Sequence, residues 1–198
     1  MPRNTFFNLN ANKRKEIIDA AIIEFSNLTI DKATVKGIIA NANISRGSFY
    51  KYFDDIDDLF YYTIQIVEEQ LYVRIIENLK KYDGDLFVSV RLAFNNEIER
   101  VKKFKSFFTN IYLASNNPDN EINKLKNATI ERGIRNISKY VNPVDFRSID
   151  VSILIAMMLN RIHELSRLAI INDEDSDILV KQFVESLKIL KFGASKGI

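Results

Sequence analysis

Residues 34–53 read TVKGIIANANISRGSFYKYF, and this stretch decides the fold. Thr34 has the side chain of a helix N-cap, because its oxygen can accept a hydrogen bond from the first free amides of a helix. Asn43 suits the left-handed position of a turn, which asparagine tolerates better than most residues. Ser45 is a second N-cap and starts a helix over residues 46–53. The stretch therefore predicts two short helices joined by a tight turn.

The second of these helices has the composition of a helix that reads DNA. It begins with Arg46, Gly47 and Ser48, a basic residue followed by two small ones that allow close approach to DNA. Phe49 and Phe53 are four residues apart and can anchor the inner face of the helix on a core. The outer face is left with Arg46, Ser48, Lys51 and Tyr52. A recognition helix in the major groove needs this division of its faces.

The charge of the stretch differs from that of the rest of the chain. Between Lys32 and Phe53 there are four basic side chains and no acidic one, although the whole chain has a net charge of only +2. Basic side chains on a small helical domain are most often simply solvated. A basic stretch within a nearly neutral chain nevertheless indicates a local anionic partner.

The sequence on either side of the stretch also predicts helices. Ile17, Ala21 and Phe25 recur at helical spacing upstream, and four aspartates between residues 54 and 58 suit the positive end of the next helix. Only six glycines and three prolines occur among 198 residues, which favours long helices over many short strands. We therefore expect an all-α fold with about nine helices. They are predicted at residues 13–27, 35–41, 46–53, 56–82, 86–101, 103–115, 118–140, 144–171 and 174–192.

Residues 14–59 resemble the TetR family of bacterial transcriptional regulators without a gap. The resemblance is carried by RKEIIDAAIIEF, which begins this range, by the stretch quoted above, and by DDL, which ends it. The rest of the chain resembles the family in its helical layout only. Three positions depart from the family pattern. Thr29 and Asn43 stand where glycines are usual, and Ile56 replaces a usual lysine that would contact a phosphate.

The resemblance implies two domains. A three-helix, helix-turn-helix DNA-binding domain is expected at residues 1–55, and a helical ligand-sensing and dimerisation domain at residues 56–198. Residues 1–12 are polar and aperiodic and are expected to form a mobile arm. The expected function is sequence-specific regulation of transcription in the cytoplasm. We expect a repressor that a small, mainly apolar or aromatic ligand releases from a near-palindromic operator in double-stranded DNA.

The resemblance also implies which side chains contact DNA. Thr34 and Tyr50 are implied to hold phosphates. Arg46 is implied to reach a base edge, where arginine with guanine is the commonest specific pair. The predicted DNA-binding residues are Thr34, Lys36, Arg46, Gly47, Ser48, Tyr50, Lys51 and Tyr52.

A ligand pocket is expected among the bulky side chains of the predicted sensing domain, since small apolar ligands bind between helices. The candidates are Phe60, Phe104, Phe107, Phe108, Tyr112, Met157, Met158 and His163. Core packing is the simpler explanation of these side chains, and a packed or hydrogen-bonded position inside the protein is the simpler explanation of His163.

A homodimer is expected from the apolar faces of the last two helices. Residues 149–159 read IDVSILIAMML, which is apolar on more than one face, so this helix must be covered on two sides. A two-fold dimer would place two recognition helices about 34–36 Å apart, one turn of DNA. The predicted interface residues are Ile149, Ile153, Ala156, Phe183, Leu187 and Leu190.

Composition also predicts absences. The chain has no cysteine and a single histidine, and it lacks a glycine-rich phosphate loop, so neither a metal, nor a cofactor, nor an enzyme is expected. Its longest apolar stretch is about half of the roughly 20 residues that a bilayer crossing needs, so no membrane partner is expected. Two alternatives stay open. The DNA-binding module can answer to a protein partner or to no ligand, and an enzyme on a helical fold is much less favoured.

Overall fold

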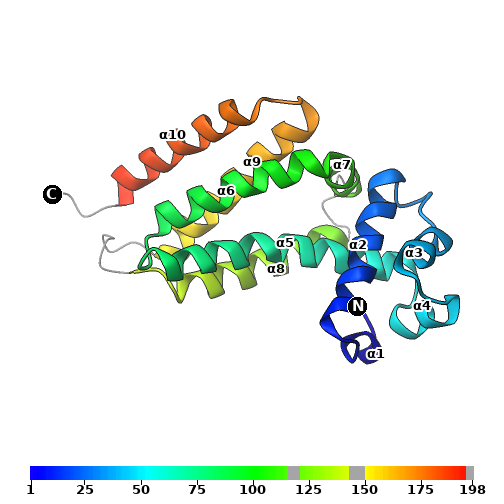
Figure 1. Ribbon diagram of the computed structural model, residues 1–198. Helices are drawn as coiled ribbons and strands as arrows, with labels where there is room; N and C mark the ends of the chain where they lie inside the picture. The colour runs from blue at the N-terminus through cyan, green and yellow to red at the C-terminus, as the bar shows by residue number, and fades with distance from the viewer. Residues whose placement is uncertain (116–120, 143–149, 195–198) are drawn as a thin grey trace. The chain divides into compact units, whose positions relative to one another are not determined.

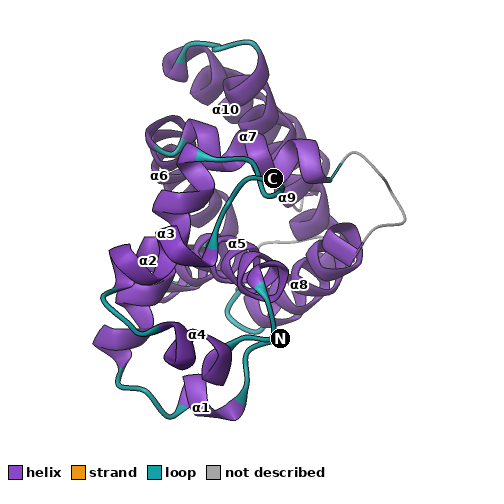
Figure 2. Ribbon diagram, turned by 90° about the vertical axis from the view of Figure 1, so that its right-hand side faces the viewer, coloured by secondary structure: helices purple, strands orange, loops and turns teal. Residues whose placement is uncertain are grey.

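The fold is described from a computed structural model, over residues 1–115, 121–142 and 150–194. Every regular element in these ranges is a helix (Figure 2), which confirms the predicted all-α fold. The helices are α1 (Asn4–Phe7), α2 (Ala11–Asn27), α3 (Val35–Ala42), α4 (Arg46–Tyr52), α5 (Ile56–Lys81), α6 (Leu86–Lys103), α7 (Lys105–Ala114), α8 (Glu121–Ser138), α9 (Val151–Ile171) and α10 (Ser176–Ala194) (Figure 1). The predicted starts of two helices at residues 118 and 144 lie outside the described residues.

The chain divides into two compact units. The first holds residues 1–67 and 104–126, and the second holds residues 68–103 and 127–198. Helix α7, predicted within the sensing domain, therefore belongs to the same compact unit as the helix-turn-helix and packs along α2. The predicted division of function at residue 55 remains a prediction.

The local signals in residues 34–53 are confirmed. The Thr34 side chain accepts a hydrogen bond from the Gly37 amide at 3.0 Å, and Ser45 accepts one from the Ser48 amide at 3.0 Å. Asn43 ends α3 in the left-handed conformation with φ of 48°. The turn between α3 and α4 is thus built by the caps that the sequence predicts.

Residues 1–12 differ from the mobile arm predicted for them. Residues 4–7 form α1, and the Phe6 side chain is completely buried. Its ring centroid lies 5.0 Å from that of Phe53 and 5.4 Å from that of Tyr62. The prediction was wrong because one buried aromatic residue in an asparagine-rich segment leaves no periodic pattern in the sequence. Its ring nevertheless buries a large apolar surface.

The core of the first unit is aromatic. Its large, fully buried side chains come from α1, α2, α4, α5 and α7 and the residue after α4. They include Phe6, Phe25, Phe49, Phe53, Phe60 and Phe107. The Asn110 side chain of α7 donates to the backbone oxygens of Phe25 and Leu28 at 2.7 and 3.1 Å, so α7 also satisfies the end of α2.

The second unit is a helical bundle in which α6, α9 and α10 pack on one another. The rings of Phe94 and Phe183 meet with centroids 4.2 Å apart. Helix α8 contributes Gly133, where an added Cβ would lie only 2.7 Å from the ring of Tyr72. Among the described helices, none is long and apolar enough to cross a membrane.

Candidate nucleic-acid interface

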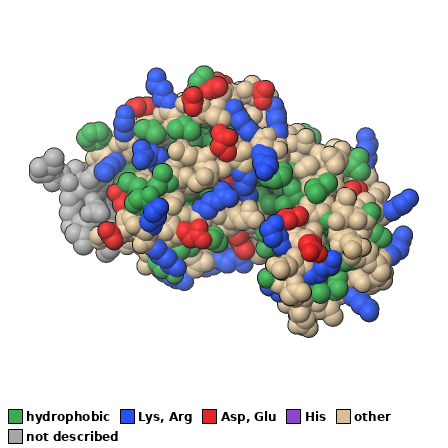
Figure 3. Space-filling view, in the orientation of Figure 1, with side chains coloured by type: hydrophobic (Ala, Val, Ile, Leu, Met, Phe, Trp, Pro, Cys, Tyr) green, Lys and Arg blue, Asp and Glu red, His purple; other side chains and the backbone are tan. Residues whose placement is uncertain are grey.

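Helices α3 and α4 pack against each other and present the predicted DNA-binding residues. Lys36, Arg46, Gly47, Tyr50 and Lys51 are all exposed. Within 4 Å of an added Cβ at Gly47 lies only the Ser45 hydroxyl, at 3.9 Å, so the start of α4 is open to close approach. Lys and Arg side chains stand out from the part of the surface formed by these helices (Figure 3).

The inner face of α4 is anchored in the core. Phe49 and Phe53 have no exposed surface, and their ring centroids are 5.6 Å apart. On the outer face, the guanidinium carbon of Arg46 lies 5.8 Å from the centroid of the Tyr50 ring, a cation–π arrangement. This arrangement keeps the exposed arginine beside the Tyr50 ring on the outer face.

Two predicted DNA contacts are more enclosed than expected. Tyr52 is half-buried, and its ring lies 6.2 Å from that of Phe6. The Ser48 hydroxyl lies 2.9 Å from the Ser45 hydroxyl at the N-cap. Tyr52 therefore contributes to the core, and Ser48 contributes to the cap.

Thr34 has a partner that sequence reasoning missed. Glu24, on α2, is buried, and its Oε1 accepts the Thr34 amide at 2.9 Å and the Thr34 hydroxyl at 3.2 Å. The single hydroxyl proton of Thr34 is thus donated to Glu24, so it is not free for a phosphate. Thr34 acts here as a cap that joins α3 to α2, and the role of phosphate donor implied by the resemblance conflicts with that bond.

Two other basic residues donate hydrogen bonds to backbone oxygens. Lys13 Nζ donates to the Ala42 oxygen at 2.9 Å, at the end of α3. Arg14 donates to the backbone oxygens of Phe7 and Leu9 at 2.8 and 2.6 Å. No sequence pattern marks the bond of Lys13, because its partner lies 29 residues away along the chain.

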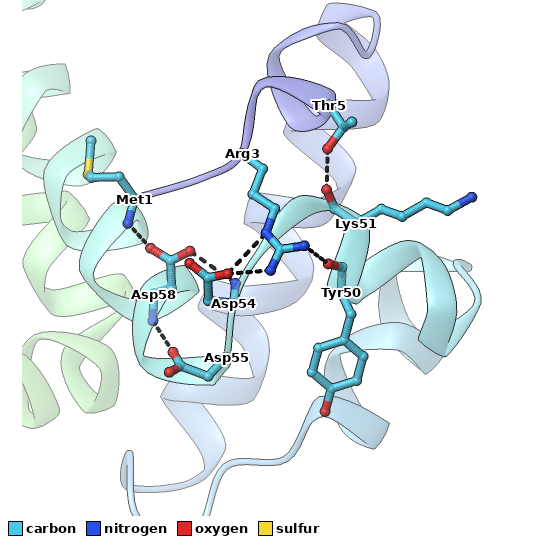
Figure 4. A network of polar contacts seen from close by, with 8 residues as sticks. All are labelled: Met1, Arg3, Thr5, Tyr50, Lys51, Asp54, Asp55 and Asp58. Carbon is cyan, nitrogen blue, oxygen red and sulfur yellow. Dashed lines mark hydrogen bonds and ion pairs between the residues drawn. The ribbon is translucent and has the colours of Figure 1, made fainter.

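The aspartates after α4 form hydrogen bonds among themselves. Asp58 accepts from the Asp54 amide at 3.2 Å, and Asp55 accepts from the Asp58 amide at 2.8 Å (Figure 4). Partial burial, together with the charge of Asp55, raises the pKa of the Asp57 carboxyl above its ordinary value. These carboxylates cap the first turn of α5, as its dipole favours.

The predicted pocket residues fall into both compact units. Phe60, Phe104, Phe107, Phe108 and Tyr112 belong to the first unit, and Met157, Met158 and His163 to the second. Phe60 and Phe107 are core residues of the first unit. Met157 is 50% exposed, so it does not line an interior. His163 Nε2 lies 3.2 Å from Glu68 Oε2, which accounts for it as a hydrogen-bonding residue.

The predicted dimer residues are only partly on the surface. Ile153 is 58% exposed, and Ala156 and Leu190 are half-buried. Phe183 and Leu187 are buried within their own unit. Ile149 lies outside the described residues. The exposed apolar side chains of α9 and α10 that the prediction omitted include Met157, Ile189 and Phe192.

A comparison with family models identifies the N-terminal helices. Residues 17–62 match the model of the bacterial regulatory proteins, tetR family. These residues are similar to the TetR family. The match spans α2, α3, α4 and the start of α5, and it confirms the resemblance predicted from the sequence. No protein of curated function matches the sequence.

Solved structures share the fold of nearly the whole chain. A protein of Mesorhizobium loti MAFF303099 assigned to the TetR-family regulators superimposes with a TM-score of 0.72 at 16% identity, over 94% of this chain and 98% of its own. The fatty acid degradation regulator FadR of Bacillus halodurans gives 0.70 at 17% identity, over 87% and 96%. FadR of Bacillus subtilis, in complex with stearoyl-CoA, gives 0.67 at 20% identity, over 90% and 98%. At 16–20% identity these likenesses show a shared fold.

Glu24 leads to a prediction about Gly37. A Cβ at Gly37 would lie 2.1 Å from Glu24 Oε2, so Gly37→Ala must displace the carboxylate from Thr34. We expect a loss of about 1–3 kcal/mol in the free energy of unfolding, the usual cost of leaving buried hydrogen-bonding groups without partners. Chemical denaturation of the full chain measures it. Gly47→Ala is the matched control, since its Cβ meets no close neighbour, and it should not destabilise the protein. Equal stability of the two variants would contradict the role of Glu24.

Proposed function

We propose that this chain is a repressor that binds a near-palindromic operator as a homodimer, through α3 and α4. The observation that carries the proposal is the division of α4 into two faces. Phe49 and Phe53 are fully buried on one side, while Arg46 and Lys51 are exposed on the other. A rigidly anchored helix with a basic outer face suits direct readout in the major groove.

The operator can be found with the protein itself. Full-length protein is incubated with fragments of its source genome, and the bound fragments are sequenced. The proposal expects a shared, near-palindromic motif with half-sites one DNA turn apart. Binding should weaken steeply with salt, since each neutralised phosphate releases counterions. Recovery of no enriched fragment at low salt would contradict DNA binding.

Arg46 provides the sharpest test of readout. Arg46→Ala should weaken binding to the selected duplex by about 1–3 kcal/mol and relax the preference at one base position, because a bidentate base contact is lost. A mobility shift against single-base variants of the duplex measures both effects. Lys139→Ala removes an equal charge from an exposed site in the second unit and should leave binding unchanged. If Arg46→Ala keeps the affinity and the base preference of the wild type, Arg46 does not read a base and other residues must do so.

The dimer is supported by exposed apolar side chains on the last two helices. Ile153 and Met157 on α9 are 58% and 50% exposed, and Ile189 and Phe192 on α10 are 74% and 83% exposed. Within each pair the side chains are three or four residues apart and share one helix face, and contiguous exposed apolar surface marks interaction sites. We therefore assign the interface to these residues with Ala156 and Leu190, and not to Phe183 or Leu187.

The interface assignment predicts a monomer when charge is introduced. Ile153→Asp combined with Phe192→Asp should dissociate the dimer, because a carboxylate buried without a partner is costly. Light scattering at micromolar concentration measures the mass. Val73→Asp is the matched control, since Val73 is also exposed, at 52%, on α5. It should remain a dimer. A wild-type monomer would refute the assembly, and a dimeric double variant would refute the interface.

A mainly apolar ligand in the second unit is the proposed signal. Three hydroxyl groups there, those of Tyr72, Ser89 and Ser166, are buried without a hydrogen-bonding partner. Burial and neighbouring glutamates raise the pKa of Tyr72, so its hydroxyl stays protonated. A ligand with an apolar body and one polar group can satisfy such a hydroxyl. The complex of the Bacillus subtilis FadR with stearoyl-CoA makes long acyl chains the first compounds to test.

The ligand proposal predicts coupled effects. Stearoyl-CoA or stearate at a hundred times its Kd should stabilise the protein by about 2.7 kcal/mol and raise its Tm. The same compound should weaken binding to the operator, since only a difference in affinity between two states can shift DNA binding. A series of acyl chain lengths with the free headgroup as control separates chain from headgroup recognition. Compounds that raise the Tm but leave operator affinity unchanged would favour the alternative of a protein partner or no effector.

A further inference from the structure

The carbonyl groups at the end of α4 are satisfied by the segment before α2. A helix leaves its last four carbonyls without partners inside the helix. In α4 the Phe49 oxygen accepts the Phe53 amide at 2.9 Å. The next three carbonyls are taken by residues of the N-terminal segment. Arg3 Nη1 donates to the Tyr50 oxygen at 2.8 Å, Thr5 Oγ1 donates to the Lys51 oxygen, and the Arg3 amide donates to the Tyr52 oxygen at 2.8 Å (Figure 4).

The need for this support follows from the length of α4. The helix has seven residues, which is less than two turns. Helices this short are not stable in water by themselves, because the cost of the first turn is not recovered. No glycine follows α4 to end it by itself, since its C-cap is Phe53 in an extended conformation. The C-terminal half of the recognition helix therefore depends on partners from elsewhere in the chain.

The supporting segment is itself fixed at both ends. Pro2 and Phe6 are buried, and the Phe6 ring contacts those of Phe53 and Tyr62 in the core. Arg14, on α2, holds the carbonyls at the other end of the segment. The segment thus links α2 to the end of α4, and it is held by a completely buried aromatic ring.

The guanidinium of Arg3 makes three hydrogen bonds in this support. Its Nε donates to Asp54 Oδ1 at 3.0 Å, its Nη2 contacts the same oxygen, and its Nη1 caps α4. The ion pair between Arg3 and Asp54 is exposed and adds little stability by itself. The capping bond to α4 and the buried Phe6 ring therefore supply most of the stability of this segment. These bonds direct the guanidinium at Asp54 and at the end of α4.

We propose that residues 3–6 form a clamp that sets the orientation of α4, with Arg3, Thr5 and Phe6 as positioning residues for DNA readout. This inference rests on the proposed DNA binding. The clamp acts only through α4, so its loss should reduce the discrimination between DNA sequences more than the general attraction to DNA. A direct phosphate contact by Arg3 would have the opposite signature.

The test compares Arg3→Ala with the wild type on two duplexes. One is the duplex that wild-type protein enriches from a random-sequence pool, and the other is a shuffled duplex of the same composition. Arg3→Ala should bind the enriched duplex about tenfold more weakly, which is the order of one lost hydrogen bond to a charged group. Binding to the shuffled duplex and the salt slope should stay near the wild-type values. Asn4→Ala, at an exposed position of α1, should behave as the wild type.

A second pair of variants covers the case in which Arg3→Ala does not fold. Thr5→Val removes the hydroxyl that caps the Lys51 carbonyl and should weaken specific binding about threefold. Thr5→Ser keeps the hydroxyl and should bind the enriched duplex as tightly as the wild type does. Equal loss on both duplexes with a salt slope reduced by about one in Arg3→Ala would identify a phosphate contact and overturn the clamp. Wild-type behaviour of Arg3→Ala and Thr5→Val would overturn it too. Failure of the wild type to enrich any duplex would instead refute the proposed function.

Discussion

The first unit depends on one constraint: a seven-residue helix must be held in a fixed orientation by groups that are not its own. Two buried phenylalanines fix its inner face, and a serine cap fixes its start. The last carbonyls are fixed by residues that lie more than forty positions earlier in the chain. All of these contacts lie on the inner side of α4 and at its ends. None of them uses the side chains of its outer face. The surface proposed to read DNA exists because the rest of the unit supplies its stability.

Helix α3 is also held by a group from elsewhere in the chain, the buried carboxylate of Glu24. Glu24 accepts both the amide and the hydroxyl of Thr34 and lies where a side chain at Gly37 would be. It thereby sets the position of α3 against α2. Since Asn110 of α7 donates to the end of α2, polar contacts connect both α3 and α7 to α2. Glu24 and Asp58 are the buried acidic residues among the described part of the first unit, and the stretch from residue 32 to residue 53 has no acidic residue.

The sequence was informative where rules are local and silent where partners are distant. Thr34, Asn43 and Ser45 could be read directly, because a cap or a left-handed turn depends on residues within one turn of helix. The buried role of Phe6 and the contacts of Arg3 and Glu24 could not be read. Their partners are ten to fifty-six positions away, and a single residue leaves no periodic pattern. The prediction for the dimer included Phe183, which is buried within its own unit, because an apolar stripe does not show whether its own unit or a partner covers it.

The most direct measurement of the central claim is amide hydrogen exchange of the full chain, alone and with the enriched duplex. In the free protein, the account predicts that the amides in the interior of α4 are already protected, since the helix is held by its anchors before DNA arrives. With the duplex at saturation, exchange should slow further in peptides that cover residues 34–53. An α4 that exchanges freely in the free protein, or protection by DNA confined to α6, α9 and α10, would contradict the account.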